Sequence, residues 1–298
     1  MATESMDLRT AGATVALRSR VGDILRYREL IVALIRKELR VRYKNSVLGF
    51  VWSLVNPAVT IGVFYVLFSL VLNNSIPYFV LFLMSGVLVW NMFNNGLAAS
   101  VGSIVGNAPL VKKVWFPREI FPLVAVGAAF IDFLIQSSVL VVAFAAMRWR
   151  IGWSYLPLIP LALIAALLFT TALALWLAAV NVRYRDMQHF LGIALMVWFW
   201  GTPIIYPFEQ VAHKLSSHGL SWLPLLNPYA IVTLSFQRAL YNRTSVHTSR
   251  TTITPMMPNH GELWYVALLG LLILVSIVLG LGAWHVFRRL EGDFAEEL

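Results

Sequence analysis

Few side chains in this sequence could act as catalytic or metal-binding groups. Cysteine is absent, which excludes a thiol nucleophile, a thiolate metal site and a disulfide framework. No segment matches G-x-x-x-x-G-K-S/T, the loop that cradles nucleotide phosphates. Histidine occurs six times without metal-ligand spacing, at positions 189, 213, 218, 247, 260 and 285. We therefore expect no catalytic group, no metal and no bound cofactor in this chain.

Binding chemistry is concentrated in residues 107–122, NAPLVKKVWFPREIFP. From position 46 to position 111 no Asp, Glu, Lys or Arg occurs, and four charges then follow within eight positions, at Lys112, Lys113, Arg118 and Glu119. Apolar side chains stand among these charges, at Leu110, Trp115 and Phe116. Cations can pair with an acidic partner, and aromatic residues dominate interface hot spots. The alternative is an amphipathic loop that packs on its own protein.

Asp132, in FIDFLIQ, is the exceptional acidic residue within an apolar stretch, with Gln136 one helical turn further on. A charge at membrane depth costs about 3 kcal/mol on insertion scales, so it should have a partner or face water. A structural ion pair and a functional role both remain open for it.

Composition shows what surrounds these residues. The 298 residues are 59% hydrophobic and 12% charged, whereas a globular domain carries about 25% charged residues. So little charge cannot cover a water-exposed surface, and we expect an all-α polytopic membrane protein. A net charge of +9 is then better read as cytoplasmic Lys and Arg than as a nucleic-acid site.

Six transmembrane spans are predicted from apolar runs of about 20 residues. They cover approximately 47–72, 78–101, 120–147, 156–181, 187–207 and 263–286, within a permease domain at 46–286. Seventeen Lys and Arg fall on one side of this arrangement and six on the other. The positive-inside rule therefore places both termini, including the tails at 1–22 and 287–298, in the cytoplasm.

Residues 23–45 have helical periodicity, with apolar residues such as Tyr27 on one face and charges on the other. The charged face holds Arg36, Lys37, Arg40 and Lys44. This pattern predicts an amphipathic helix in the membrane interface, and the alternative is a solvated helix packed on protein. Residues 208–243 contain two further helical patterns, which could dip back into the membrane surface if they are buried in protein or line water.

The sequence resembles a known family through four motifs in the same order. They are RKELRVRYKNSVLGFVWSLVNP, LVKKVWFPREIFP, RYRDMQHFLGIALMVWFWGTPIIYP and LLNPYAIV. These motifs are similar to the membrane subunit of type 2 ABC exporters for lipid-linked polysaccharide, the Wzm-type O-antigen, teichoic acid and galactan permeases. The resemblance covers residues 24 to 286, nearly the whole chain.

The resemblance implies a role for each unusual segment. Residues 107–119 would be the cytoplasmic coupling helix between spans two and three, which docks on a separate ATPase. The helix at 23–45 would form an interface gate. Residues 208–243 would supply re-entrant helices at the extracytoplasmic exit, with gate residues at Trp222, Asn227, Tyr229 and Phe236. Two permeases and two ATPases, the latter binding ATP and Mg, would work together in the bacterial cytoplasmic membrane.

Aromatic residues within the spans are candidates for the lining of a glycan conduit. Flat rings offer similar contact to each passing sugar, while fixed charges would be costly to desolvate. The candidates are Trp52, Asn56, Tyr65, Trp90, Trp198 and Phe199. The alternative for each ring is lipid anchoring or helix packing.

Other functions remain to be weighed against a lipid-linked glycan exporter. A type 2 ABC permease could instead carry a drug or a lipid. A polytopic membrane glycosyltransferase would need clustered acidic or His residues at one membrane face, and the sequence shows no such cluster.

The predicted topology can be tested with cysteine labels, because the native sequence contains no cysteine. Labels introduced at Ser19, Lys113 and Glu297 should react with an impermeant maleimide only from the cytoplasm. Labels at Asn74 and Ser245 should react only from outside. An external Lys113 would contradict both the charge-based orientation and the coupling role.

Overall fold

The structure, a computed structural model, describes residues 22, 24, 26–43, 51–67, 76–113, 116–149, 151–247 and 253–298. Its helices are α2 (Arg28–Tyr43), α3 (Trp52–Tyr65), α4 (Phe79–Val101), α5 (Ser103–Gly106), α6 (Ala108–Lys113), α7 (Ile120–Ala146), η3 (Trp153–Tyr155), α8 (Leu158–Arg183), α9 (Met187–Trp200), α10 (Phe208–Ser216), η4 (Leu223–Leu226), α11 (Pro228–Leu240), α12 (Glu262–Glu291) and α13 (Phe294–Glu297). Two short antiparallel strands, β1 (Ser245–His247) and β2 (Ile253–Pro255), form a hairpin.

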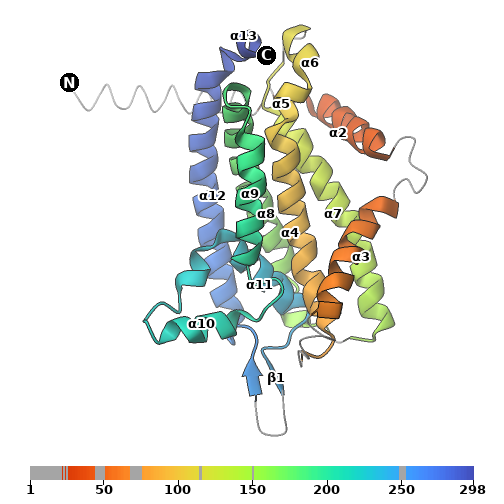
Figure 1. The fold of residues 1–298 in the computed structure, drawn as a ribbon, viewed down its shortest axis with the longest axis vertical. Helices are drawn as coiled ribbons and strands as arrows, with labels where there is room; N and C mark the ends of the chain where they lie inside the picture. Colours follow the sequence, from red (N-terminus) through yellow and green to blue (C-terminus); the bar gives the residue numbers. More distant parts are fainter. Residues whose placement is uncertain are drawn as a thin grey trace, which may run out of the picture.

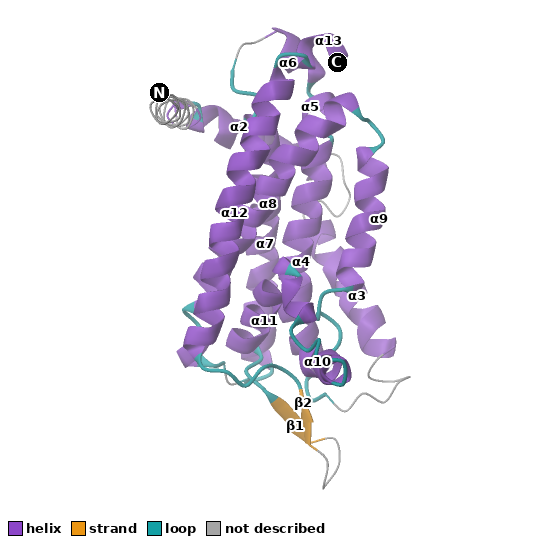
Figure 2. Ribbon diagram, turned by 90° about the vertical axis from the view of Figure 1, so that its left-hand side faces the viewer, coloured by secondary structure: helices purple, strands orange, loops and turns teal. Residues whose placement is uncertain are grey.

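The long helices α4, α7, α8, α9 and α12 form one elongated bundle (Figures 1 and 2). We call the end with α5, α6 and α13 the upper end, and the end with α10 and the β1–β2 hairpin the lower end (Figure 1). Helix α2 lies beside the upper half of the bundle, and α11 lies among the lower parts of the long helices (Figure 1).

Four helical segments of the described residues are long and apolar enough to cross a membrane: Phe79–Val101, Ile120–Ala146, Trp153–Arg183 and Glu262–Glu291. At 1.5 Å per residue each exceeds the ~30 Å hydrocarbon thickness. They coincide with the second, third, fourth and sixth predicted spans. The all-α membrane fold is therefore confirmed, while six crossings stay a prediction.

The first and fifth predicted spans are shorter helices in the structure. Helix α3 has 14 residues, and the remainder of the predicted span at 47–72 lies largely outside the described residues. Helix α9 also has 14 residues, so the range 187–207 was too long for one helix. The helix ends at Trp200 because Gly201 and Pro203 follow, and proline removes a backbone donor.

Helix α4 is the centre of the bundle, and small residues let its neighbours approach it closely. A Cβ added at Gly96 would meet Thr170 of α8 at 3.3 Å and Ala129 of α7 at 3.6 Å. A Cβ at Gly86 would meet Thr233 of α11 at 3.2 Å. Association of helices in lipid depends on such van der Waals contact, since hydrocarbon offers no hydrophobic drive between helices.

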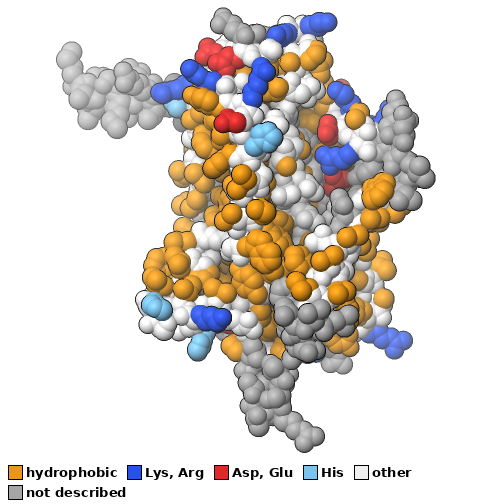
Figure 3. Space-filling model, viewed as in Figure 1, with side chains coloured by type: hydrophobic (Ala, Val, Ile, Leu, Met, Phe, Trp, Pro, Cys, Tyr) orange, Lys and Arg blue, Asp and Glu red, His pale blue; other side chains and the backbone are white. Residues whose placement is uncertain are grey.

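The outer surface agrees with a lipid environment for the middle of the bundle. Large apolar side chains are exposed there, including Val141 and Val142 of α7, Ile193 of α9 and Val278 of α12. In the space-filling view, Lys and Arg gather toward the upper end, and hydrophobic side chains cover much of the middle (Figure 3). This distribution is typical of a membrane protein whose basic residues lie on one side.

Candidate functional site

The charged segment at 107–119 lies at the upper end and is only partly helical. Helix α6 covers Ala108–Lys113, and Trp115 lies outside the described residues. Lys112 and Lys113 are exposed at the end of this helix, and Leu110 is half-buried. Cations at a helix C-terminus are favoured by the macrodipole, and this short helix ends in two exposed positive charges.

Phe116 is buried within its own chain. Its side chain is only 8% exposed, and its ring lies 5.4 Å from that of Phe121 at the start of α7. It belongs to an apolar cluster with Ile104 and Val111. This burial favours the alternative of packing on its own bundle, and a docking role for the ring stays a prediction.

The C-terminal segment holds this region from above, a contact that the sequence did not reveal. The guanidinium of Arg118 donates a hydrogen bond to the carbonyl of Glu291 and lies 5.8 Å from the ring centre of Phe294. Phe294 is buried against Phe287 of α12, with ring centres 5.5 Å apart. Glu119 is buried beside Arg118 in the sequence. The sequence contains both Arg118 and Phe294, but their wide separation along the chain gives no sign that they are in contact.

A second upper-end loop joins the same assembly. The Nε atom of Arg183, at the end of α8, lies 4.0 Å from a carboxylate oxygen of Glu297. The guanidinium of Arg185 donates to the backbone carbonyl of Glu297 at 3.2 Å. The C-terminal helix α13 therefore bridges the segment at 116–119 and the loop between α8 and α9. We call this set of contacts the upper-end tie.

Helix α2 packs on α7 through its apolar face. Ile35 lies against Gly127, where an added Cβ would meet its Cδ1 atom at 2.8 Å. Tyr27 is half-buried, and its side chain packs against the apolar cluster that contains Phe116. The charged residues Arg36, Lys37 and Arg40 are exposed, and Lys44 lies outside the described residues. The predicted amphipathic character holds, with protein covering part of the apolar face.

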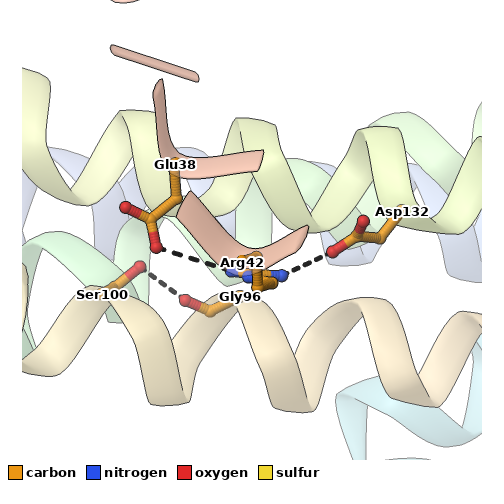
Figure 4. A network of polar contacts seen from close by, with 5 residues as sticks. All are labelled: Glu38, Arg42, Gly96, Ser100 and Asp132. Atoms are coloured by element: carbon orange, nitrogen blue, oxygen red, sulfur yellow. Dashed lines mark hydrogen bonds and ion pairs between the residues drawn. The ribbon is translucent and has the colours of Figure 1, made fainter. Parts of the chain in front are cut away.

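Asp132 forms an ion pair with α2. An Nη1 atom of Arg42 donates to its Oδ2 atom at 2.5 Å, and the Nη2 atom of Arg42 lies 3.8 Å from Glu38 (Figure 4). The Asp132 side chain is 6% exposed and that of Arg42 is 33% exposed. This finding favours the structural reading of Asp132. The ion pair lies beside α4, in which the Ser100 hydroxyl donates to the Gly96 carbonyl (Figure 4).

The aromatic conduit candidates divide into a buried group and an exposed group. Trp90 is 4% exposed, and its ring lies 5.6 Å from Phe199 and 5.9 Å from Tyr229. Trp198 stands 5.1 Å from Phe93. These rings form a packed aromatic core between α4, α9 and α11. Within the described chain Trp90 is thus buried among other rings, and its expected place in a conduit lining stays a prediction.

Trp52 and Tyr65 of α3 are exposed, at 50% and 38%, and the Asn56 side chain lies outside the described residues. Phe64 of α3 stacks on Phe199 at 5.9 Å. Helix α3 thus meets the aromatic core through Phe64, while Trp52 and Tyr65, 13 residues apart at opposite ends of the helix, are exposed at separate positions.

Asn227 fastens the end of α9 to the start of α11. Its Nδ2 atom donates to the Gly201 carbonyl at 3.0 Å and to the Thr202 hydroxyl at 2.9 Å. Its Oδ1 atom accepts from Trp198 Nε1 at 2.8 Å and from the backbone N–H of Tyr229 at 3.0 Å. One amide thus uses both donors and both acceptor positions. The carbonyl that the end of α9 leaves free is satisfied within the protein, as a nonpolar environment requires.

The other gate candidates differ in exposure. Trp222 is 52% exposed, whereas Tyr229 and Phe236 of α11 are buried. The hydroxyl of Tyr229 donates to the Val89 carbonyl of α4 at 3.2 Å. Residues 201–261 begin and end at the lower end, with α11 inserted among the long helices (Figure 1). Only Trp222 of this set is therefore available for surface contact in this conformation.

The residue after α11 secures the lower end. The Tyr241 hydroxyl donates to the Pro77 carbonyl at 2.7 Å. Desolvation by burial raises the pKa of this phenol to about 12, despite the opposing influence of the Arg243 charge. The hydroxyl therefore keeps its proton, and this hydrogen bond persists at physiological pH.

Known proteins supply the context for this geometry. The sequence model of the ABC-2 type transporter family matches residues 29–241, which is most of the chain. The chain belongs to the ABC-2 type transporter family. The expectation of a Wzm-type permease is confirmed by this match and by the relatives described next.

Individual relatives of the permease have names related to polysaccharide transport. It is 30% identical over 270 residues to an O-antigen export system permease protein RfbA of Klebsiella pneumoniae, covering 91% of this chain and 95% of the relative. It is 30% identical over 279 residues to RfbA of Myxococcus xanthus, covering 93% and 98%. It is 23% identical over 205 residues to the polysialic acid transport protein KpsM of Escherichia coli, covering 66% and 77%.

The permease shows no grouping of three His, Cys, Asp or Glu side chains that could hold a metal ion among its described residues. The arrangement that it does contain is mechanical. Three devices connect distant segments: the upper-end tie, the Arg42–Asp132 pair and the Asn227 hub. Each joins segments that are far apart in the sequence.

Removing Arg42 should loosen α2 more than removing Asp132 does. Arg42→Gln breaks the ion pair to a buried carboxylate, and breaking such a pair costs about 3 kcal/mol. In Asp132→Asn the one-third exposed Arg42 can turn to water and Glu38. Hydrogen exchange over α2 should accelerate about 100-fold in the first variant and less in the second. Arg40→Gln is the exposed control and should change little. A larger effect of Asp132→Asn would show that Asp132 serves more than this pair.

Phe294→Ala should release α13 and disorder the upper-end tie. Deleting a buried phenylalanine ring costs about 3–5 kcal/mol, more than a helix as short as α13 supplies on its own. Hydrogen exchange should therefore rise in residues 287–298 and also around Arg118. Glu297→Gln removes only a partly exposed ion pair, worth about 1 kcal/mol or less, and is the matched control. Unchanged exchange around Arg118 in Phe294→Ala would mean that the tail is not part of this assembly.

Proposed function

We propose that this permease is the membrane subunit of an ATP-driven exporter that moves a lipid-linked polysaccharide across the bacterial cytoplasmic membrane. The observation that carries the proposal is the 30% identity to O-antigen export permeases over more than nine-tenths of each chain. The shorter match to a polysialic acid transport protein supports a polysaccharide as cargo. The permease would contribute no covalent chemistry, and ATP and Mg would be bound by a separate ATPase subunit.

The upper end is the proposed docking face for that ATPase. Lys112 and Lys113 are exposed and would pair with acidic groups on the partner. Arg118 is held by the C-terminal segment, so a push on this face would reach α12 and α7 together. In this scheme the ATPase closes on ATP and shifts the permease between conformations through its different affinity for each.

The cargo path is proposed to lie between two copies of the permease. Trp52 and Tyr65 of α3 are exposed in one copy, and Phe64 of the same helix stacks on Phe199 of the aromatic core. A second copy facing α3 would enclose these rings and produce a passage with flat walls and few fixed charges. Such walls would suit a repetitive polar chain, because each sugar ring meets the same kind of surface.

Two alternatives are distinguishable by what they require. A permease for a drug or another lipid would have the same docking face for the ATPase and would differ only in the molecule that it transports. A membrane glycosyltransferase would need clustered acidic or His groups, and the described residues contain no grouping of three such side chains. The exporter remains the function that the relatives favour.

The deciding experiment is a deletion strain for this gene complemented with variants. Loss of the permease should cause completed lipid-linked glycan to accumulate inside the cell, and the amount of surface glycan should fall correspondingly. Lys112→Glu combined with Lys113→Glu should fail to restore export and should weaken co-purification of the ATPase. Lys214→Glu, an exposed charge reversal at the lower end, should restore both. Surface glycan that persists without the permease would refute the assignment of cargo.

Purified alone, the permease should hydrolyse no ATP, because the sequence contains no phosphate-cradling loop.

A further inference from the structure

A groove of about 460 Å³ lies between the lower halves of α7 and α8, away from the upper-end tie and the aromatic core. Leu140 and Phe144 of α7 line one side, and Ile159 and Leu163 of α8 line the other. Ser137 is the hydroxyl residue in the lining, and its Oγ atom donates to the Phe133 carbonyl at 2.8 Å. Because the Ser137 hydroxyl already donates within its own helix, the inner part of the groove needs no hydrogen bond from a ligand and suits a hydrocarbon chain.

The groove has the length of one membrane leaflet. Its α7 lining runs from Phe133 to Ala145, about 18 Å at 1.5 Å per residue. Half of a bilayer's hydrocarbon thickness is about 15 Å. Val141, on the rim of the groove, is 67% exposed, and neighbouring Val142 is 66% exposed. The groove thus opens onto an apolar surface that lipid covers.

A cation stands where the groove meets the lower end. Arg148 lines the groove just after α7, and its guanidinium has no ion pair or hydrogen bond within the part of the chain that the structure describes. Its backbone has φ 48°, at a helix end where the N–H of Trp149 bonds to the Phe144 carbonyl at 3.0 Å. Glycine is the usual residue in this αL position, so an arginine here is held in an unfavourable backbone conformation.

Aromatic residues mark the mouth as a membrane–water interface. Trp149 stacks on Tyr241 at 5.2 Å and contacts Tyr78 at 4.9 Å. Its Nε1 atom donates to the Leu240 carbonyl at 3.2 Å. Trp and Tyr gather at the headgroup level of membranes. Arg148 is thus at the depth of lipid phosphates while the groove runs inward from it.

We infer that this groove binds one acyl chain of an anionic phospholipid, with the lipid phosphate at Arg148. Moving a chain from the bilayer into an apolar groove gains no hydrophobic free energy. Selection must therefore come from shape and from the unpaired cation. A lipid phosphate would supply the negative charge that neutralises this cation as the groove is covered.

The bound lipid would pack against α11. Phe236 and Leu240 of α11 form the floor of the groove, and the Phe236 ring lies 6.0 Å from Phe133 of α7. A chain in the groove therefore fills the space between α7 and α11. The inference depends only on membrane insertion and holds whatever the cargo is.

The test uses the full permease in nanodiscs that contain phosphatidylglycerol with a photoreactive diazirine on its acyl chain. Cross-links should map by mass spectrometry to residues 133–149 and 159–163. Unlabelled phosphatidylglycerol should compete about fivefold better than phosphatidylcholine, the effect of one basic residue near a phosphate. Arg148→Gln should abolish this preference, and Lys214→Gln, an exposed cation at the same end, should preserve it.

A second variant, Ser137→Phe, fills the groove without changing its mouth and should lower cross-linking of the photoreactive phosphatidylglycerol. Each nanodisc sample is checked by size-exclusion chromatography, so misfolding is separated from loss of binding. Equal competition by the two lipids would overturn the inference, and so would an unchanged preference in Arg148→Gln. Absence of lipid cross-links at residues 133–149 would overturn the inference as well.

Discussion

Close contact with α4 is the constraint on which the rest of the structure depends. A helix that is buried in lipid gains nothing from the hydrophobic effect when another helix covers it, so stability comes from contact and from satisfied polar groups. Gly96 and Gly86 bring α7, α8 and α11 within van der Waals distance of α4. The hydroxyl of Tyr229 then reaches a carbonyl of α4. Insertion of α11 among the long helices follows from this closeness.

The upper end obeys a different rule, since it must be rigid without being inside the membrane. There the structure combines a small apolar cluster around Phe116 with cation contacts to Phe294 and to carbonyl groups. Neither component would suffice alone, because exposed ion pairs contribute little and the apolar cluster is small. Together they join two loops and the chain's last helix into one body beneath the exposed lysines.

Much of the fold could be predicted from the sequence, because long apolar runs and uneven basic charge respond directly to the bilayer. The amphipathic pattern at 23–45 and the helical patterns within 208–243 also correspond to helices. Direction was harder to predict than existence. Phe116 and Trp90 were expected to face a partner or a passage, and both are buried, because composition does not say which neighbour claims an aromatic ring.

Pairings across long separations could not be predicted either. Asp132 was expected to need a partner, but nothing in the sequence selects Arg42, which is 90 positions away. The same holds for Arg118 and the backbone carbonyl of Glu291 at the end of α12. Such pairs are fixed by how helices tilt and pack, and this information is not present in periodicity or local motifs. The end of α9 at Trp200 was predictable from Gly201 and Pro203, had helix breakers been weighed above hydropathy.

The saturated amide of Asn227 has a mechanical consequence. An aspartate in its place could not donate, and a glutamine would carry the amide one methylene further, so neither could restore all four hydrogen bonds. The end of α9 and the start of α11 are thereby joined by one side chain, although Trp200 and Asn227 are 27 positions apart along the chain. A movement that separates the two helices here would have to break these hydrogen bonds. Tilting the two helices together would keep them.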